Sequence, residues 1–369
     1  MSLNKPGALP SQAIRDLIRA GFIIGADQEN VRPSSLDLSL SDEAYEVEGI
    51  FQPQPDETVR EVLQQISKKK HDLKKPLQCN TMYVVRLNET LKLPKQVYAY
   101  SNPKSTSGRL DLHVRLMADM VSRYDAVTPA GWQGELWLAL MPKSFVVKLT
   151  PKQTLNQIRF FTADTRFGEL ELEIAMSQYN LIWRQRKQVP LKYEEVRISD
   201  NDGSMILSLD LSQDIIGYQG IDICSEPIDL AKNNFYSAKK FFKPVKKQGS
   251  FLYLKQGEFY ILSTSEAVRV PPELACEMVP MDERSGEFRS HYAGFIDPGW
   301  GWGEKGEGKG RPLTLEVRPF EDIIVRHHQP IARIRFERMM ELPDMVYDSQ
   351  LSNYSTQSGP RLAKQFKIK

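Results

Sequence analysis

The sequence predicts a mainly β protein made of two similar halves. Short runs of alternating or β-branched residues are separated by Pro, Gly, Asn and Asp, and long stretches with helical periodicity are scarce. Many residues of the first half also return in the same order in the second half. Because 369 residues exceed the usual size of one hydrophobic core, we expect two domains with a core each.

The first predicted element is a short amphipathic helix. Ser11 is in place to cap it, Ile14 and Leu17 recur at helical spacing, and Gly21 follows as a stop. The elements after it are strands, predicted at residues 36–40, 82–87, 135–140, 156–161 and 310–317. We expect one β domain at residues 1–191, a polar linker at 192–204 and a second β domain at 205–369.

The repeated segments keep the same order in both halves, and several of them share one offset. Tyr83-Val84-Val85 precedes Glu89, and Tyr260-Ile261-Leu262 precedes Glu266, each 177 positions later. Further matches pair 131–132 with 299–300, 136–140 with 313–317, 157–160 with 333–336 and, upstream, 35–38 with 220–223. A duplication with two long copies predicts two similar domains rather than a solenoid.

Composition excludes several classes of protein. With 41% hydrophobic and 26% charged residues the chain has the composition of a folded protein, and its net charge of +2 gives no general attraction to nucleic acid or membrane. Cys79, Cys224 and Cys276 are too few and too scattered for a disulfide framework or a cysteine-rich zinc site. No secretory signal or long apolar segment is present, so we expect a cytoplasmic protein with reduced thiols.

Three other segments and a pair of histidines are candidates for binding. The basic runs at 68–75 and 239–247 are interpreted as solvated loops because no nucleic-acid motif accompanies them. The glycine-rich segment 301–310 lacks the endings of phosphate-binding loops and is interpreted as a flexible hairpin that could act as a lid. His327 and His328 would point to opposite faces of a strand, which makes them poor shared metal ligands.

Two segments could carry chemistry. Residues 104–109 place two cations, three hydroxyls and a glycine together, which suits a polyphosphate, although a plain Ser/Thr-rich turn explains the composition equally well. In the strand at 310–317, Thr314 and Glu316 lie on the face opposite Leu313, Leu315 and Val317. Glu316 is therefore either a solvated surface charge or a working acid.

Together these segments resemble the dCTP deaminase branch of the deoxyuridine triphosphatase superfamily, in its long duplicated form. The matching pieces cover nearly the whole chain: residues 9–18, 33–38, 104–109, 296–300, 313–316 and 354–359. The resemblance implies tandem distorted jelly-roll domains, normally assembled as a trimer with sites between neighbouring domains. Three two-domain chains are therefore expected to form the oligomer.

The resemblance also implies roles for individual residues. Glu316 would be the general acid/base in the hydrolysis of dCTP to dUTP and ammonia, and Asp297 would contact the deoxyribose. Backbone groups around Thr314 and Leu315 would read the base edge. Substrate-binding residues would further include Lys104, Ser105, Thr106, Ser107, Gly108 and Arg109 at the triphosphate, and Tyr354 and Gln357 from the C-terminal tail. No protein-bound cofactor is implied, and Mg²⁺ would enter with the triphosphate.

The two halves depart from this family pattern in complementary ways. Ala139 stands where the second half has Glu316, and Trp137 replaces Thr314. The second half lacks the hydroxyl pair of 104–109, so we expect a composite site that joins the first cradle to the second carboxylate. Asn353 stands where the family usually has a lysine. A bifunctional enzyme that also cleaves dUTP to dUMP, or a non-catalytic nucleotide-binding regulator, remains the alternative.

Overall fold

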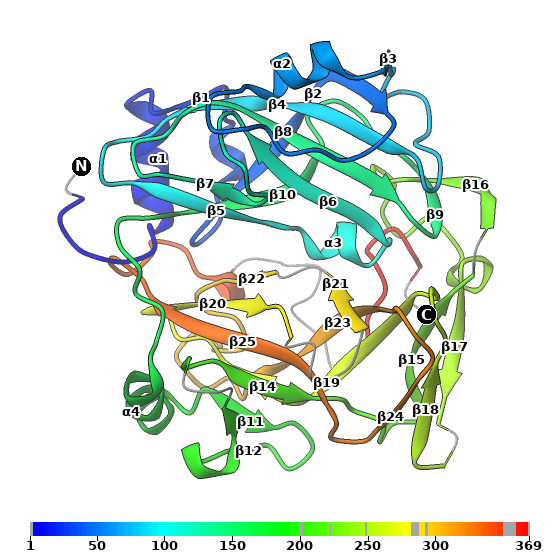
Figure 1. The fold of residues 1–369 in the computed structure, drawn as a ribbon. Helices are drawn as coiled ribbons and strands as arrows, with labels where there is room; N and C mark the ends of the chain where they lie inside the picture. The colour runs from blue at the N-terminus through cyan, green and yellow to red at the C-terminus, as the bar shows by residue number, and fades with distance from the viewer. Residues whose placement is uncertain are drawn as a thin grey trace. The chain divides into compact units, whose positions relative to one another are not determined.

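The computed structural model of the chain describes residues 3–198, 202–221, 223–247, 249–281, 288–291, 294–349 and 359–367, with the backbone alone at 223–225 and 288–291. The chain forms two compact units. The first contains residues 1–163, 222–237 and 363–369, and the second contains residues 164–221 and 238–362. Both units are mainly β, as predicted, and their sheets have the curled arrangement of a jelly roll (Figure 1).

The first unit is built on a nine-stranded sheet with the strand order β6-β8-β4-β2-β10-β5-β7, to which β1 and β3 add at β4 and β2. Its elements are α1 Ser11–Arg19, β1 Ile23–Ile24, η1 Gln28–Asn30, β2 Leu36–Val47, α2 Val59–Gln65, β3 Lys68–Lys70, β4 Met82–Lys92, β5 Tyr98–Pro103, α3 Ser105–Gly108, β6 Leu112–Ala118, β7 Ala126–Val127, β8 Gln133–Pro142, β9 Phe145–Lys148, β10 Thr154–Phe161 and β16 Ile223–Asp229. The long strand β2 pairs with β10 through its first residues and with β4 through its last ones, so it turns the corner of the sheet.

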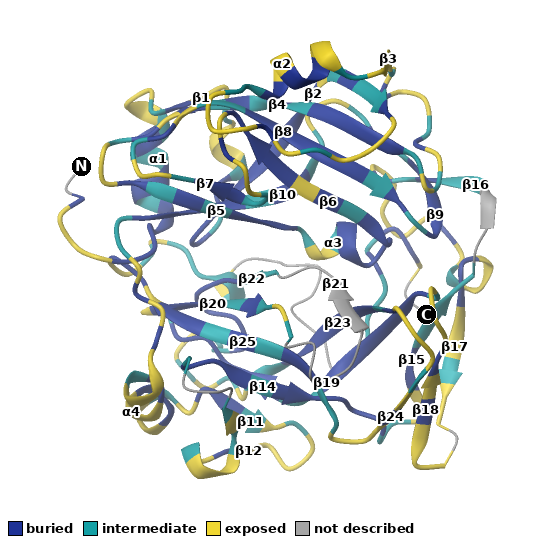
Figure 2. Cartoon of the chain, in the orientation of Figure 1, coloured by how far each residue is buried: buried dark blue, intermediate teal, exposed yellow. Residues whose placement is uncertain are grey.

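The second unit contains a seven-stranded sheet and a five-stranded sheet. The first has the order β12-β11-β19-β15-β17, with β23 added at β19 and β21 at β23, and the second has the order β13-β14-β25-β20-β22. Its elements are α4 Glu169–Tyr179, β11 Ile182–Arg184, β12 Val189–Pro190, η2 Tyr193–Glu195, β13 Arg197–Ile198, β14 Met205–Ser208, β15 Ile215–Gly220, η3 Ala238–Lys240, β17 Phe242–Lys246, β18 Phe251–Leu254, β19 Tyr260–Val268, β20 Leu274–Val279, β21 Phe288–His291, β22 Phe295–Ile296, β23 Arg311–Pro319, β24 Ile323–Arg326, β25 Pro330–Arg338 and η5 Tyr347–Ser349. Leu315 and Val317 of the first sheet and Ile334 and Phe336 of the second belong to one buried core. Figure 2 shows most of β8 and most of β23 in dark blue, as buried strands that each lie between two others.

The two units repeat the same ladder register. In the first unit β4 pairs with β8, and Val84 lies opposite Ala139; in the second β19 pairs with β23, and Ile261 lies opposite Glu316. Both partners are shifted by 177 positions, and a bulge interrupts both ladders at the same place, after Arg86 and after Ser263. Ala139 and Glu316 therefore hold equivalent positions in their two sheets, as the sequence comparison predicted.

The predicted match between 35–38 and 220–223 is wrong. Leu36 pairs with Ile158 in the first unit, and Met205 pairs with Ile334, the counterpart of Ile158, in the second. The true counterpart of residues 36–39 is therefore 205–208. The error arose because the Leu-Asp-Leu pattern recurs as Ile-Asp-Ile at 221–223, whereas the true counterpart has no aspartate.

A serine and a glutamate link the same two strands in each unit. Ser39 donates through its N–H and hydroxyl to the Glu89 carboxylate at 2.7–3.1 Å, and Ser208 donates in the same way to Glu266 at 2.6 and 2.8 Å. Glu89 is fully buried, and burial raises the pKa of its carboxyl to about 7 in spite of the Ser39 hydrogen bonds. Each contact therefore ties the bulge of one strand to a serine of the other.

Each unit also begins with a helix, which moves the boundary between them. The N–H of Leu9, just before α1, donates to Phe160 O, and the N–H of Phe167, just before α4, donates to Phe336 O. The second unit thus starts at Asp164, and the predicted linker 192–204 lies inside it, because residues 167–191 contribute side chains to the second core. Pro10 rather than Ser11 occupies the N-cap of α1. Among the described residues, none of the helices has the length and apolar character required to cross a membrane.

The units differ most in one connection. In the first unit the chain between β2 and β3 contains α2, whose first turn is closed by a capping box between Thr58 and Glu61. Val59 and Leu63 of α2 belong to a small hydrophobic cluster with Trp137 and Ala139. In the second unit the corresponding residues lie between β15 and β17, but 222–237 belong to the first unit, where β16 pairs in parallel with β9. In the first unit this connection therefore covers the side of the sheet that carries Trp137 and Ala139, whereas in the second unit its middle part belongs to the other unit.

Candidate functional site

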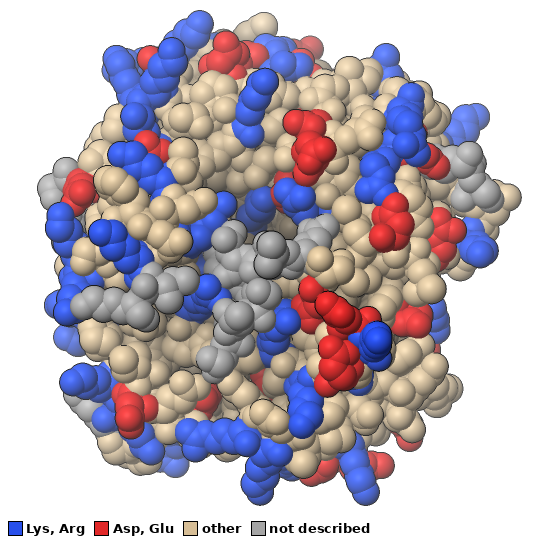
Figure 3. All heavy atoms as spheres, turned by 180° about the vertical axis from the view of Figure 1, so that it is seen from behind, with Lys and Arg blue, Asp and Glu red and all other residues tan. Residues whose placement is uncertain are grey.

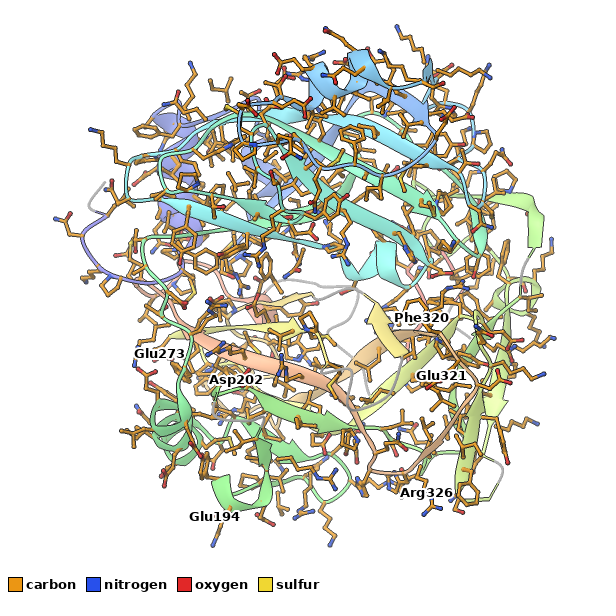
Figure 4. The ribbon with its side chains drawn as sticks, viewed as in Figure 1. Glu194, Asp202, Glu273, Phe320, Glu321 and Arg326 are labelled. Atoms are coloured by element: carbon orange, nitrogen blue, oxygen red, sulfur yellow. The ribbon has the colours of Figure 1, made fainter. Side chains whose placement is uncertain are left out.

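The candidate acid lies in the middle of β23. Leu313, Leu315 and Val317 face the second core, so Thr314 and Glu316 face the other way, yet they are only 7% and 4% exposed. A solvated surface charge would be far more exposed, and the structure therefore excludes that interpretation for Glu316. The strand ends at Pro319, immediately before Phe320 and Glu321, which are labelled in Figure 4.

A bulge in β19 holds the start of this strand. Ser263 lies opposite Thr314, but the next ladder pair is Ala267 with Pro312, so three residues of β19 bulge beside Leu313. The Thr264 hydroxyl accepts the Leu313 N–H at 2.9 Å and donates to the carbonyl of Glu266 at 2.8 Å. A side chain thus replaces the missing ladder bond, and no sequence pattern predicts this role of Thr264.

Asp297 follows β22 and is 8% exposed. Its turn is pinned by η5: Tyr347 donates its N–H to Pro298 O at 2.8 Å, and its ring lies 4.9 Å from that of Trp300. At Gly299, which has φ +90°, a Cβ would lie 2.7 Å from the Val346 side chain, so this close approach requires glycine. The side chain of Asp297 is therefore placed by a rigid turn.

Asp348 connects this turn to the Glu316 strand. Its carboxylate accepts from Arg311, the first residue of β23, at 2.5 Å and from the Gly303 N–H at 2.9 Å. Arg269 stacks on Trp302 at 3.9 Å and donates to the carbonyl of Gly306. The segment 301–310 is therefore fastened to the second unit at several points, which corrects its interpretation as a flexible hairpin and lid.

The residues of the predicted cradle form α3, directly after β5. Ser105 is exposed, Thr106 is half-buried, and Ser107 and Gly108 are buried in the turn, where Ser107 donates its hydroxyl to Leu155 O at 2.9 Å. Arg109 is only 3% exposed. Ser105 and Thr106 thus present their hydroxyls at the start of the turn, while Ser107 has a structural role in holding it.

The ammonium of Lys104 has partners within the first unit. Its Nζ lies 2.5 Å from Asp37 Oδ2 and 3.0 Å from Thr154 Oγ1, and Arg32 Nε also contacts Asp37 Oδ2 at 2.8 Å. Asp37 is 1% exposed, so this charge is neutralised by the two cations. Sequence reasoning missed Arg32, although its position five residues before Asp37 is visible in the chain.

The counterparts of both acids are uncharged in the first unit. Ala99 pairs with Val127 where Cys276 pairs with Ile296, so Thr128 takes the place of Asp297. Ala139 takes the place of Glu316, and the ring of Trp137, which is fully buried, fills the place of Thr314. The face that is polar in the second unit is a hydrophobic cluster in the first.

The tail residues and the histidine pair complete the predicted candidates. Tyr354 and Gln357, predicted to close over the nucleotide, lie outside the described residues. His327 and His328 do not point to opposite faces as predicted: they lie in the turn before β25, and their rings stack at 3.8 Å. Burial lowers the pKa of His328. Within the described residues, no group of three or more His, Cys, Asp or Glu side chains is arranged to hold a metal ion.

Charged side chains of both signs are interspersed on the face drawn in Figure 3. In the second unit, a cavity of about 260 Å³ lies behind the β19 bulge and is lined by residues that include Ser208, Glu266 and His328. The cavity therefore lies next to the contact between Ser208 and Glu266. The residues that line this cavity do not include Glu316 or the residues of the predicted cradle.

Comparisons with known proteins identify the family. The N-terminal domain model of 2'-deoxycytidine 5'-triphosphate deaminase matches residues 5–164, and the C-terminal domain model matches residues 178–366. The crystal structure of a 2'-deoxycytidine 5'-triphosphate deaminase from Agrobacterium tumefaciens is 34% identical, covers 95% of this chain and 100% of its own, and superposes with a TM-score of 0.85.

Two other comparisons add nothing to this result. A dUTPase of Staphylococcus bacteriophage 80alpha matches 48% of this chain and 94% of its own, with 11% identity and a TM-score of 0.25, which is too low to support an argument. A search of curated proteins finds no match. With both family models matched in order along nearly its whole length, the chain belongs to the 2'-deoxycytidine 5'-triphosphate deaminase family.

Proposed function

We propose that the protein hydrolyses dCTP to dUTP and ammonia, with Glu316 as general acid/base. The observation that carries this proposal is the burial of Glu316 on a small polar face, where the other repeat has alanine in a hydrophobic cluster. Keeping a carboxylate buried costs free energy, and the alanine at this position of the first repeat shows that the strand forms without one. Family membership supplies the substrate class.

In the proposed reaction Glu316 takes a proton from water as the water oxygen attacks C4 of cytosine. Glu316 passes this proton to N3 as the C4–N3 double bond opens, and then carries the proton of the new hydroxyl to the amino group, which leaves as ammonia while the uracil carbonyl forms. Asp297 would contact the deoxyribose, and backbone groups around Thr314 and Leu315 would read the base edge. The carboxylate returns to its starting state, so one residue can serve both proton transfers.

We propose that the first unit supplies the triphosphate contacts, through Ser105, Thr106 and Arg109. Because Lys104 already neutralises the buried Asp37, we expect it to support the turn more than to bind phosphate. Mg²⁺ would enter as the counterion of the triphosphate, held mainly by phosphate oxygens and water. A trimer of two-domain chains is proposed from the family resemblance, and a mass measurement in solution tests it.

The first experiment is incubation with dCTP and Mg²⁺, in which ammonia release is followed and dUTP is separated from dUMP. Ammonia with dUTP supports the proposal, dUMP would indicate the bifunctional alternative, and binding without ammonia would indicate a regulator. Glu316→Gln should reduce kcat by at least about 100-fold, the usual contribution of a general base. Glu321→Gln, an exposed residue just beyond the same strand, is the matched control and should retain activity.

A mixing experiment tests the composite site. Ser105→Ala/Arg109→Ala chains and Glu316→Gln chains are each expected to be inactive. Recovery of activity after the two are unfolded together and reassembled would mean that the cradle and the acid come from different chains. Two inactive parents without recovery would place both in one chain. A Ser105→Ala/Arg109→Ala variant with wild-type kcat and KM would reject the cradle altogether.

A further inference from the structure

We propose that the side-chain hydroxyl of Thr314 holds the attacking water together with Glu316, an inference that rests on the proposed function. Thr314 is 7% exposed, and its Oγ1 has no hydrogen-bond partner among the described residues. A buried hydroxyl without a partner is costly, and native proteins normally satisfy such a group with protein, ligand or water. The hydroxyl therefore points to a hydrogen-bonding molecule on this face of β23.

The spacing of the two side chains suits a single water molecule. Thr314 and Glu316 are two residues apart on one strand, so their side chains share a face and their Cα atoms lie about 7 Å apart. Two hydrogen bonds of about 2.8 Å made by one water span roughly 5 Å, which fits between a short hydroxyl and a longer carboxylate. A hydroxyl can accept from this water while the carboxylate takes its proton.

The described neighbours on β19 do not replace the hydroxyl. Ser263 lies opposite Thr314 and directs its own hydroxyl to the carbonyl of Thr264 at 3.4 Å. Ile261 lies opposite Glu316 and is apolar. In the first unit Trp137 occupies the position of Thr314, and Ala139 occupies the position of Glu316. The repeat without the acid therefore also lacks the hydroxyl.

The test compares Thr314→Val, Thr314→Ser and Ser263→Ala in the full-length protein. Valine keeps the shape of threonine and removes the hydroxyl. We expect Thr314→Val to lower kcat for dCTP by about 10- to 100-fold with KM within about twofold, because the water is misplaced while the nucleotide still binds. Thr314→Ser should restore most of the rate, and Ser263→Ala should stay within about threefold of wild type.

The melting temperature separates this role from a structural one. Because the hydroxyl has no hydrogen-bond partner in the described part of the chain, Thr314→Val should melt at the same temperature as wild type or above it. A lower melting temperature, an unchanged kcat, a loss expressed in KM, or an equal loss in Ser263→Ala would each overturn the inference. Absence of ammonia release by the wild-type enzyme would instead refute the proposed function, so the two failures are distinguishable.

Discussion

The buried carboxylate of Glu89 makes the stability of the first unit depend on pH in a defined direction. Its pKa is about 7 in the folded chain against 4.5 as its ordinary value, so the folded state binds the proton more tightly between these limits. Stability from this group is fully present below about pH 4.5 and is lost as pH rises through 7. At about 1.4 kcal/mol for each pKa unit, the free energy of unfolding should fall by about 2 kcal/mol between pH 5.5 and pH 8.

Glu89→Gln removes the titration and keeps an oxygen to accept from Ser39. We expect the variant to lack this 2 kcal/mol decline, so that it gains stability relative to wild type as pH rises. Calorimetric unfolding of both proteins at pH 5.5 and pH 8 measures the difference, which amounts to a few degrees in melting temperature for a unit of this size. Glu266→Gln, which changes the same contact in the second unit, is the matched control. If wild type and Glu89→Gln show parallel pH profiles, burial does not govern this carboxyl.

Three further predictions concern the repeats. Ala139→Glu should not create a second site: it places an unpaired carboxylate beside Trp137 and should cost roughly 3 kcal/mol or more in unfolding free energy, and equilibrium binding of dCTP should still give one nucleotide per chain. Thr264→Val removes the acceptor of the Leu313 N–H and should cost about 1–3 kcal/mol, whereas Thr264→Ser should melt close to wild type. Asp348→Ala removes the partner of Arg311 and should lower both the melting temperature and kcat/KM; unaltered kinetics would show that this contact does not position β23.

The strands were predictable because their signal is local. Alternation along 310–317 assigned Leu313, Leu315 and Val317 to the core and Thr314 and Glu316 to the opposite face, and the structure has this arrangement. The register was predictable for a different reason. When two paired strands have the same offset from their copies in the other repeat, the ladder between them has the same register in both repeats. Ala139 could therefore be matched to Glu316 from the sequence alone.

Helices and connections were less predictable, since their signals depend on partners distant in sequence. Residues 169–174 alternate Glu with Leu or Ile, a strand-like period, yet they form the first turns of α4, with Leu170 and Ile174 exposed and Leu172 buried. The roles of Thr264 and Asp348 depend on a bulge and on a turn that no short sequence pattern announces. The burial of Glu316 was not predictable from the strand either. Alternation places Glu316 on the face opposite the core, but it does not indicate whether that face is exposed to solvent.

The divergence of the repeats can be traced to that second face. In the first unit Trp137 and Ala139 are apolar, and α2 packs Val59 and Leu63 against them, so the face is a small core. In the second unit the corresponding connection contributes residues 222–237 to the first unit instead, and the face keeps Thr314 and Glu316. A polar pair under α2 would lose hydration without gaining a substrate, whereas an apolar pair in the second unit would remove the chemistry. The path of one connection and the identity of two residues are therefore coupled, and this coupling leads us to expect one reacting centre per chain.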